Sequence, residues 1–171
     1  MTTLEIAKSA GLSGEAKPFV RDDQKPEECA GTLADHELFA DAIALLAHSR
    51  EAADAIKWGY VCVKKLAPAE EQGTDASLEA VEAWLEKPGD ETRRAAGAAA
   101  EDSGKSRPSD LLALAVFFSG GSITEPDAPP ADPPPFVANK MVAGSVQLSV
   151  VGYPPERNAA RYRIAIQLAK S

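Results

Sequence analysis

The stretch from Arg50 to Ala67 (REAADAIKWGYVCVKKLA) constrains the fold more than any other part of this chain. At about 3.6 residues per turn, its apolar residues form two stripes, one through Ile56 and the other through Trp58 and Cys62. A helix that is apolar on most sides is typical of the centre of a helical domain, where several neighbours cover it. We therefore expect this helix to be the central one.

Most of the remaining sequence also repeats with a helical period. Asp35 is a candidate N-terminal cap for the helix over residues 36–48. Gly31 is a candidate end for the helix over residues 26–30. The short break at His48 and Ser49 predicts that the helices on either side pair as an antiparallel hairpin. We expect helices over residues 3–10, 26–30, 36–48, 50–67, 77–87, 91–102, 110–119 and 158–170.

Residues 136–151 are ambiguous between strand and helix. The run SVQLSVV alternates like a strand, but Val142, Val146 and Val150 also share one helical face. No other segment offers a clear partner strand, so we expect a helix.

Gly97 stands among alanines in the run AAGAAA. Glycine weakens a helix interior by about 1 kcal/mol relative to alanine. We therefore expect a neighbouring element to approach the helix closely at this position.

Proline dominates the segment between residues 122 and 135, called here the proline-rich segment. Six of the ten residues from 126 to 135 are proline, which excludes a helix or a central strand and favours an extended polyproline conformation. We expect it to lie as a strap across its own domain, with Phe136 packed on aromatic side chains. The alternative is a partner's aromatic groove that takes Pro129, Pro130 and Pro133.

The chain of 171 residues is long enough for one domain with a core. We predict an all-α fold, a compact bundle of packed antiparallel helical hairpins. Its parts are a less regular segment (1–33), a helical core (34–121), the proline-rich segment and a C-terminal helical pair (136–171). The expected core anchors are Trp58, Cys62, Trp84, Phe117 and Phe118.

Composition argues against several partners. The net charge of −8 and the absence of a long basic run disfavour nucleic acid and anionic membrane surfaces. The longest apolar run, Leu111 to Phe118, is far shorter than the roughly 20 residues that span a membrane. Two cysteines without a CxxC motif indicate reduced thiols, and the N-terminus has no signal-peptide pattern, so we expect a cytoplasmic protein.

No catalytic, cofactor or metal site emerges from the motifs. Cys62 lies within an apolar helix stripe, and Cys29 has only Lys25 nearby to lower its pKa. His36 and His48 lie about 18 Å apart along one helix, too far to share a metal ion.

Residues 70–91 hold eight acidic residues and one lysine. This acidic face is either a solvated surface or a contact for a basic partner. The candidate contact residues are Glu70, Glu71, Glu79, Glu82 and Glu86.

Several fragments together resemble a known bacterial family, the domain of unknown function 6931. They are KWGYVCVKK, VEAWLEKPGDETRRAAGAAAE, LAVFFSGGSI, the proline-rich segment and MVAGSVQLSV, within residues 34–171. The resemblance implies a small, mostly helical protein, with some members encoded near type VI secretion or similar contractile machinery. It implies no activity, cofactor or catalytic residue.

We therefore expect a non-enzymatic cytoplasmic interaction module: an adaptor, a chaperone or an accessory subunit of a secretion system. One alternative is an immunity or regulatory protein that binds a basic partner through the acidic face. Another is a small-molecule-binding protein or enzyme with a pocket between the helices of Trp58 and of Phe117 and Phe118.

Overall fold

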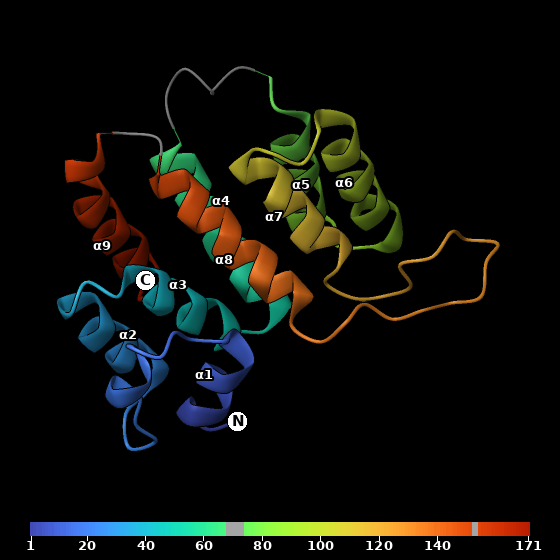
Figure 1. Cartoon of the computed structure of the whole chain (residues 1–171). Helices are drawn as coiled ribbons and strands as arrows, with labels where there is room; N and C mark the ends of the chain where they lie inside the picture. Colours follow the sequence, from blue (N-terminus) through green and yellow to red (C-terminus); the bar gives the residue numbers. More distant parts are fainter. Residues whose placement is uncertain (68–73, 152–153) are drawn as a thin grey trace.

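The computed structural model describes residues 1–67, 74–151 and 154–171, and the described part contains helices and no strand, which confirms the all-α fold. Two short 3-10 helices accompany the α-helices, η1 (Lys17–Phe19) and η3 (Pro155–Arg157). The α-helices of Figure 1 are α1 (Thr3–Ala10), α2 (Pro26–Asp35), α3 (Phe39–His48), α4 (Ala52–Leu66), α5 (Ala76–Glu86), α6 (Asp90–Ser103), α7 (Pro108–Phe117), α8 (Val137–Val150) and α9 (Asn158–Leu168).

The centre of the fold is shared by α4 and α8. Helix α8 packs against α3, α4, α7 and α9, and it crosses the middle of the molecule in Figure 1. Val142, Val146 and Val150 are fully buried, whereas Leu148 on the opposite face is exposed. The predicted helix over this segment is therefore confirmed. The prediction that α4 alone is central was incomplete, because α8 is packed on as many sides.

Helices α3 and α4 do not form the antiparallel hairpin that their short connection predicted. They are not packed along each other, and α8 lies against both instead. Asn139 of α8 explains the geometry, because its Nδ2 donates hydrogen bonds to the carbonyls of Ala47 (2.8 Å) and Arg50 (2.9 Å). The bond to Ala47 satisfies a carbonyl at the end of α3 that has no partner within its helix. The amide thus fixes the corner between the two helices.

The boundary between α2 and α3 also differs from the prediction. Helix α2 continues through Gly31, the expected stop, because Leu33 and Ala34 are buried against the core. It ends at Asp35, so this residue does not cap the next helix, as the sequence suggested. The chain turns at Glu37, which has a φ of 60°, and α3 begins two residues later.

Helices α5, α6 and α7 follow one another through short turns and pack together, as the predicted hairpins require. Gly97 of α6 faces Phe117 of α7. A Cβ atom at Gly97 would lie 2.8 Å from the Phe117 Cδ2 atom, closer than side chains pack. The close approach predicted from the isolated glycine is confirmed.

Arginine side chains hold the ends of several helices together. Arg161 of α9 donates to the carbonyls of Ser149 (2.6 Å) and Val150 (3.1 Å) at the end of α8, and to the carbonyl of Leu66 at the end of α4. The planar guanidinium offers five N–H donors in a fixed fork, wider than the three donors on the single nitrogen of lysine. Because the last carbonyls of a helix have no intrahelical partner, these bonds close both ends and attach α9 to them.

Candidate interaction surface

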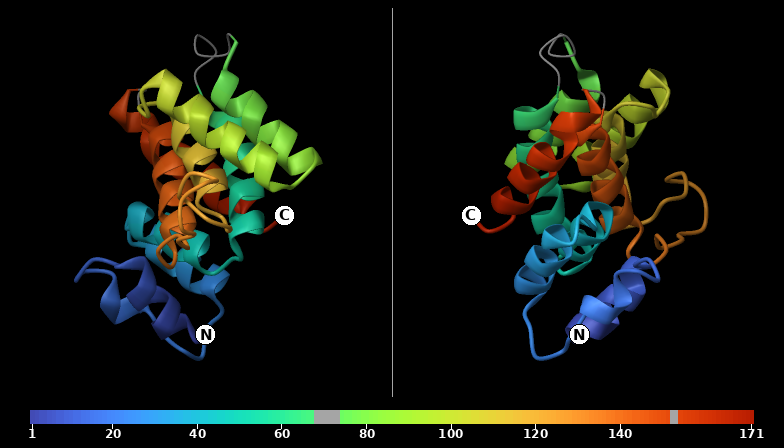
Figure 2. Two further views of the ribbon diagram at one scale, coloured as in Figure 1. Left: turned by 90° about the vertical axis from the view of Figure 1, so that its right-hand side faces the viewer. Right: turned by 60° about the vertical axis from the view of Figure 1, so that its left-hand side comes forward.

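The proline-rich segment leaves the end of α7, projects from the body as a loop and returns to α8 (Figures 1 and 2). Pro129 and Pro130 are exposed and Pro133 is half-buried. The expected strap across the domain is therefore wrong. Phe136, at the returning end, packs against the ring of His48 (centroids 5.8 Å apart) and not against an aromatic cluster.

Two arginines of α6 fix the base of the proline-rich segment. Arg93 donates from Nη1 to the carbonyl of Phe117 (2.6 Å) and from Nη2 to the carbonyl of Ser122 (2.8 Å). Arg94 donates from Nη1 to the carbonyl of Thr124 (2.9 Å). The body thus binds the first residues of the segment through their backbone and leaves its prolines outside.

Asp90, at the start of α6, orients both guanidinium groups. Its carboxylate accepts hydrogen bonds from Arg93 Nη2 (2.6 Å) and Arg94 Nε (2.8 Å). The hydrogen bonds from these two arginines lower the pKa of the Asp90 carboxyl. Asp90, Arg93 and Arg94 therefore form one clamp, built on a single helix.

Hydrogen bonds within the proline-rich segment hold its shape. The N–H of Ile123 donates to the carbonyl of Ala131 (2.9 Å), and the N–H of Ala131 donates to Ser122 Oγ (3.1 Å). Thr124 Oγ1 donates to the carbonyl of Pro129 (2.9 Å). These bonds close a turn within the segment, in addition to the bonds from Arg93 and Arg94 at its base.

The charge of the proline-rich segment has one sign. It contains Glu125, Asp127 and Asp132 and no basic residue. All three side chains are exposed, and none forms an ion pair or a side-chain hydrogen bond with another described residue. The segment thus presents apolar proline rings beside unpaired carboxylates.

Of the candidate contact residues on the acidic face, two are exposed and a third is paired. Glu79 and Glu86 are exposed on α5. Glu82 accepts a hydrogen bond from the Tyr60 hydroxyl (2.6 Å) and lies 3.6 Å from Lys64 Nζ. Burial and the hydrogen bond to Glu82 raise the pKa of Tyr60 to about 12. Two further candidates lie outside the described residues, namely Glu70 and Glu71.

Trp58, Trp84 and Cys62 lie in the core. Trp58 and Trp84 are 5% and 8% exposed, and Cys62 is fully buried. Trp58 Nε1 donates to the carbonyl of Ala165 in α9 (3.0 Å), and the Arg50 guanidinium lies 5.4 Å from the ring centroid. Burial raises the pKa of the Cys62 thiol to about 12, which disfavours the reactive thiolate.

Phe117 and Phe118, the other two candidate core anchors, are only half-buried. Phe117 packs against Gly97 of α6, with the Arg93 guanidinium 5.1 Å from its ring centroid, and Phe118 contacts its edge. Phe117 thus faces α6, whereas Trp58 faces α9. The structure does not bring these rings around a common pocket.

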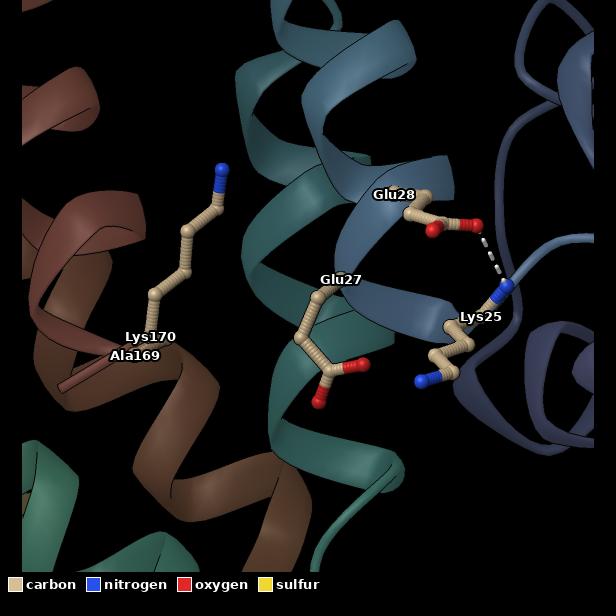
Figure 3. Close-up of a pocket in the computed structure, with 5 residues that line it drawn as sticks. All are labelled: Lys25, Glu27, Glu28, Ala169 and Lys170. Atoms are coloured by element: carbon tan, nitrogen blue, oxygen red, sulfur yellow. Dashed lines mark hydrogen bonds between the residues drawn. The ribbon is translucent and has the colours of Figure 1, made fainter.

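A polar pocket of about 450 Å³ lies between the start of α2 and the end of α9 (Figure 3). Glu28 accepts a hydrogen bond from the backbone N–H of Lys25 (3.1 Å), and Glu27 lies 4.0 Å from Arg50 Nη2. Both carboxylates therefore already have partners within the protein. Ala169 and Lys170 complete the lining.

Sequence reasoning missed a second hollow, an apolar groove of about 510 Å³ beside α1. The groove exists only because residues 12–20 fold next to α1, and the sequence gives no pattern that would place them there. Among the described residues, no three His, Cys, Asp or Glu side chains gather as a metal site would need. Every helix in residues 1–67, 74–151 and 154–171 is too short or too polar to cross a membrane.

The model of one protein family, described as a family of unknown function (DUF6931), matches residues 29–171. No curated protein and no solved structure matches the chain. The matched region contains the clamp of α6, the proline-rich segment and α8, but not α1. Because the match covers most of the sequence, the chain belongs to the DUF6931 family.

Proposed function

We propose that this protein is a non-enzymatic interaction module that presents its proline-rich segment to a protein partner. The observation that carries the proposal is an exposed, internally bonded segment whose base is clamped by Arg93 and Arg94. A ligand already held in its bound shape loses little conformational entropy on binding. Polyproline segments are used as ligands elsewhere for this reason.

The chemistry of the segment defines the partner. Its proline rings suit a groove lined by aromatic or other apolar side chains, and Glu125, Asp127 and Asp132 suit lysine or arginine beside that groove. An adaptor, a chaperone or an accessory subunit would use such a contact. A cytoplasmic setting beside a secretion apparatus is the context that the family resemblance implies.

The state of the two thiols supports a non-enzymatic role. Cys29 and Cys62 are both fully buried, and burial raises the pKa of each. A nucleophilic cysteine needs the opposite, an accessible sulfur whose pKa is lowered by a basic neighbour.

The test is affinity capture from the native host with the full chain and a variant in which Pro129, Pro130 and Pro133 are alanine. We expect a partner that the wild type captures in stoichiometric amount and the variant loses. The substitutions leave Arg93 and Arg94 in place, and an unchanged melting temperature would show that the body is intact. A variant that captures the same partner as the wild type would contradict the proposal.

The acidic face supplies the matched control and the alternative. Glu79 and Glu86 lie two turns apart on one exposed side of α5. If the proline-rich segment is the ligand, Glu79→Lys/Glu86→Lys keeps the partner. Loss of the partner in this variant alone would favour an immunity or regulatory protein that binds a basic partner through α5.

A further inference from the structure

The apolar groove beside α1 is an unusual surface on this chain. Leu4, Leu12 and Val20 are among its apolar lining residues, and its charged lining residues are Lys8 and Lys17. Leu4 is 48% exposed, a large apolar side chain left open to water. Among the described residues that line the groove none is acidic, although the chain has a net charge of −8.

The charges at this groove and on the proline-rich segment complement each other. Lys8 and Lys17 are exposed, and neither forms an ion pair with another residue of the described part of the chain. The segment carries three exposed acidic side chains that also lack such partners. The groove therefore combines apolar side chains with two lysines that have no described ion-pair partner. The proline-rich segment combines proline rings with three carboxylates that have no described partner.

We propose that this groove binds the proline-rich segment of a second copy of the chain. Proline rings can be buried against apolar side chains without leaving a backbone N–H unsatisfied. The carboxylates of Glu125, Asp127 and Asp132 would then meet the two lysines of the groove. In the right-hand view of Figure 2 the segment projects above α1 from the same side of the body, so each copy presents both halves of the contact.

In this self-association, the partner of the proline-rich segment is a second copy of the chain. The proposal rests on the proposed function of that segment as a ligand. The groove residues, 4–20, precede residues 29–171, which the family model matches. The contact is small, which predicts a weak and salt-sensitive association with a dissociation constant of roughly 1 μM to 1 mM.

Sedimentation velocity of the full chain, from roughly 10 μM to 1 mM to bracket that affinity, tests the proposal. We expect the average mass of the wild type to rise with concentration. The variant Lys8→Glu/Lys17→Glu reverses the charge of the groove and should remain monomeric. The variant Glu125→Lys/Asp127→Lys/Asp132→Lys reverses the charge of the segment and should also remain monomeric. All five side chains are exposed, so the fold should survive, as circular dichroism can verify.

An equimolar mixture of the two variants is the decisive sample. The acidic segment of the groove variant again faces a basic groove, and the basic segment of the other variant faces an acidic groove. We expect the mixture to associate although neither component does. The control Lys57→Glu/Lys87→Glu has the same change in charge at exposed sites outside the groove and should associate like the wild type.

Four results would overturn the inference: a wild type that is monomeric throughout, association that survives either reversal, a mixture that stays monomeric, or a control that also dissociates. The proposed function fails differently. If Lys8→Glu/Lys17→Glu still captures the host partner but does not self-associate, host binding and self-association use different grooves and both proposals stand.

Discussion

Replacement of Asp110 by asparagine measures what one buried carboxylate contributes to this fold. The Asp110 side chain is fully buried at the start of α7. It accepts hydrogen bonds from Ser77 Oγ (2.7 Å), the Arg107 N–H (3.0 Å) and Arg107 Nη2 (3.1 Å). Burial acts to raise its pKa, but the hydrogen bonds from Arg107 and Ser77 outweigh burial and lower the pKa to about 2.

The magnitude follows from the change in pKa on folding. A carboxyl whose pKa falls from 3.8 to about 2 gains roughly 2 kcal/mol of stability from its ionisation. Because the folded pKa is the lower one, this contribution is complete above about pH 4 and is lost as the pH falls through 2. Asparagine keeps the shape and loses the charge. We therefore expect Asp110→Asn to be less stable than the wild type, with a difference that shrinks by roughly 2 kcal/mol between pH 5 and pH 2.

Urea unfolding followed by tryptophan fluorescence, at several pH values between about 2 and 7, measures this difference. Urea is preferable to guanidinium because it is uncharged and does not screen the Arg107 interaction. Asp127→Asn removes an exposed carboxylate without a described partner and should follow the wild-type curve. A destabilisation by Asp110→Asn that is the same at pH 5 and pH 2 would refute the reasoning.

Two further predictions concern the core. Gly97→Ala should lower stability by about 1 kcal/mol, since overpacking against Phe117 costs about 1–3 kcal/mol and the gain in helix propensity returns only about 1. A thermal melt should show a decrease of a few degrees, and an unchanged or higher melting temperature would show that the Phe117 ring shifts freely. Cys29 and Cys62 should not react with a thiol reagent at mildly alkaline pH in the native protein, because both are buried with raised pKa values, and both should react in urea; rapid reaction of the native protein would contradict this.

Features set by a few neighbouring residues could be predicted from the sequence. The helix expected over residues 3–10 is α1, which Thr2 caps by accepting from the Glu5 N–H and Gly11 ends in the left-handed conformation. Gly97 predicted a close approach because glycine weakens a helix, and tight packing against a neighbour compensates for that cost. The stripe through Val142, Val146 and Val150 correctly predicted a helix. In each case, local spacing and residue type contain the relevant physics.

Features set by distant residues could not be predicted. The corner between α3 and α4 depends on Asn139, which lies about 90 residues further along the chain. The position of the proline-rich segment depends on Arg93 and Arg94, which read in the sequence as surface charges of an alanine-rich helix. Only the fold shows that they face backbone carbonyls of the next loop. The expected strap assumed that apolar rings would seek the core, and it neglected these anchors at the base.

The central place of α8 has a consequence for synthesis of the protein. Helices α3, α4 and α7 are made first, yet each of them buries part of its apolar surface against α8. A ribosome adds roughly 5–20 residues per second, so these surfaces stay uncovered for seconds after they emerge. We expect nascent chains that stop before residue 137 to expose apolar surface, to be incompletely folded and to aggregate readily. The proline-rich segment connects these helices to α8 and α9, which must pack last to complete the core.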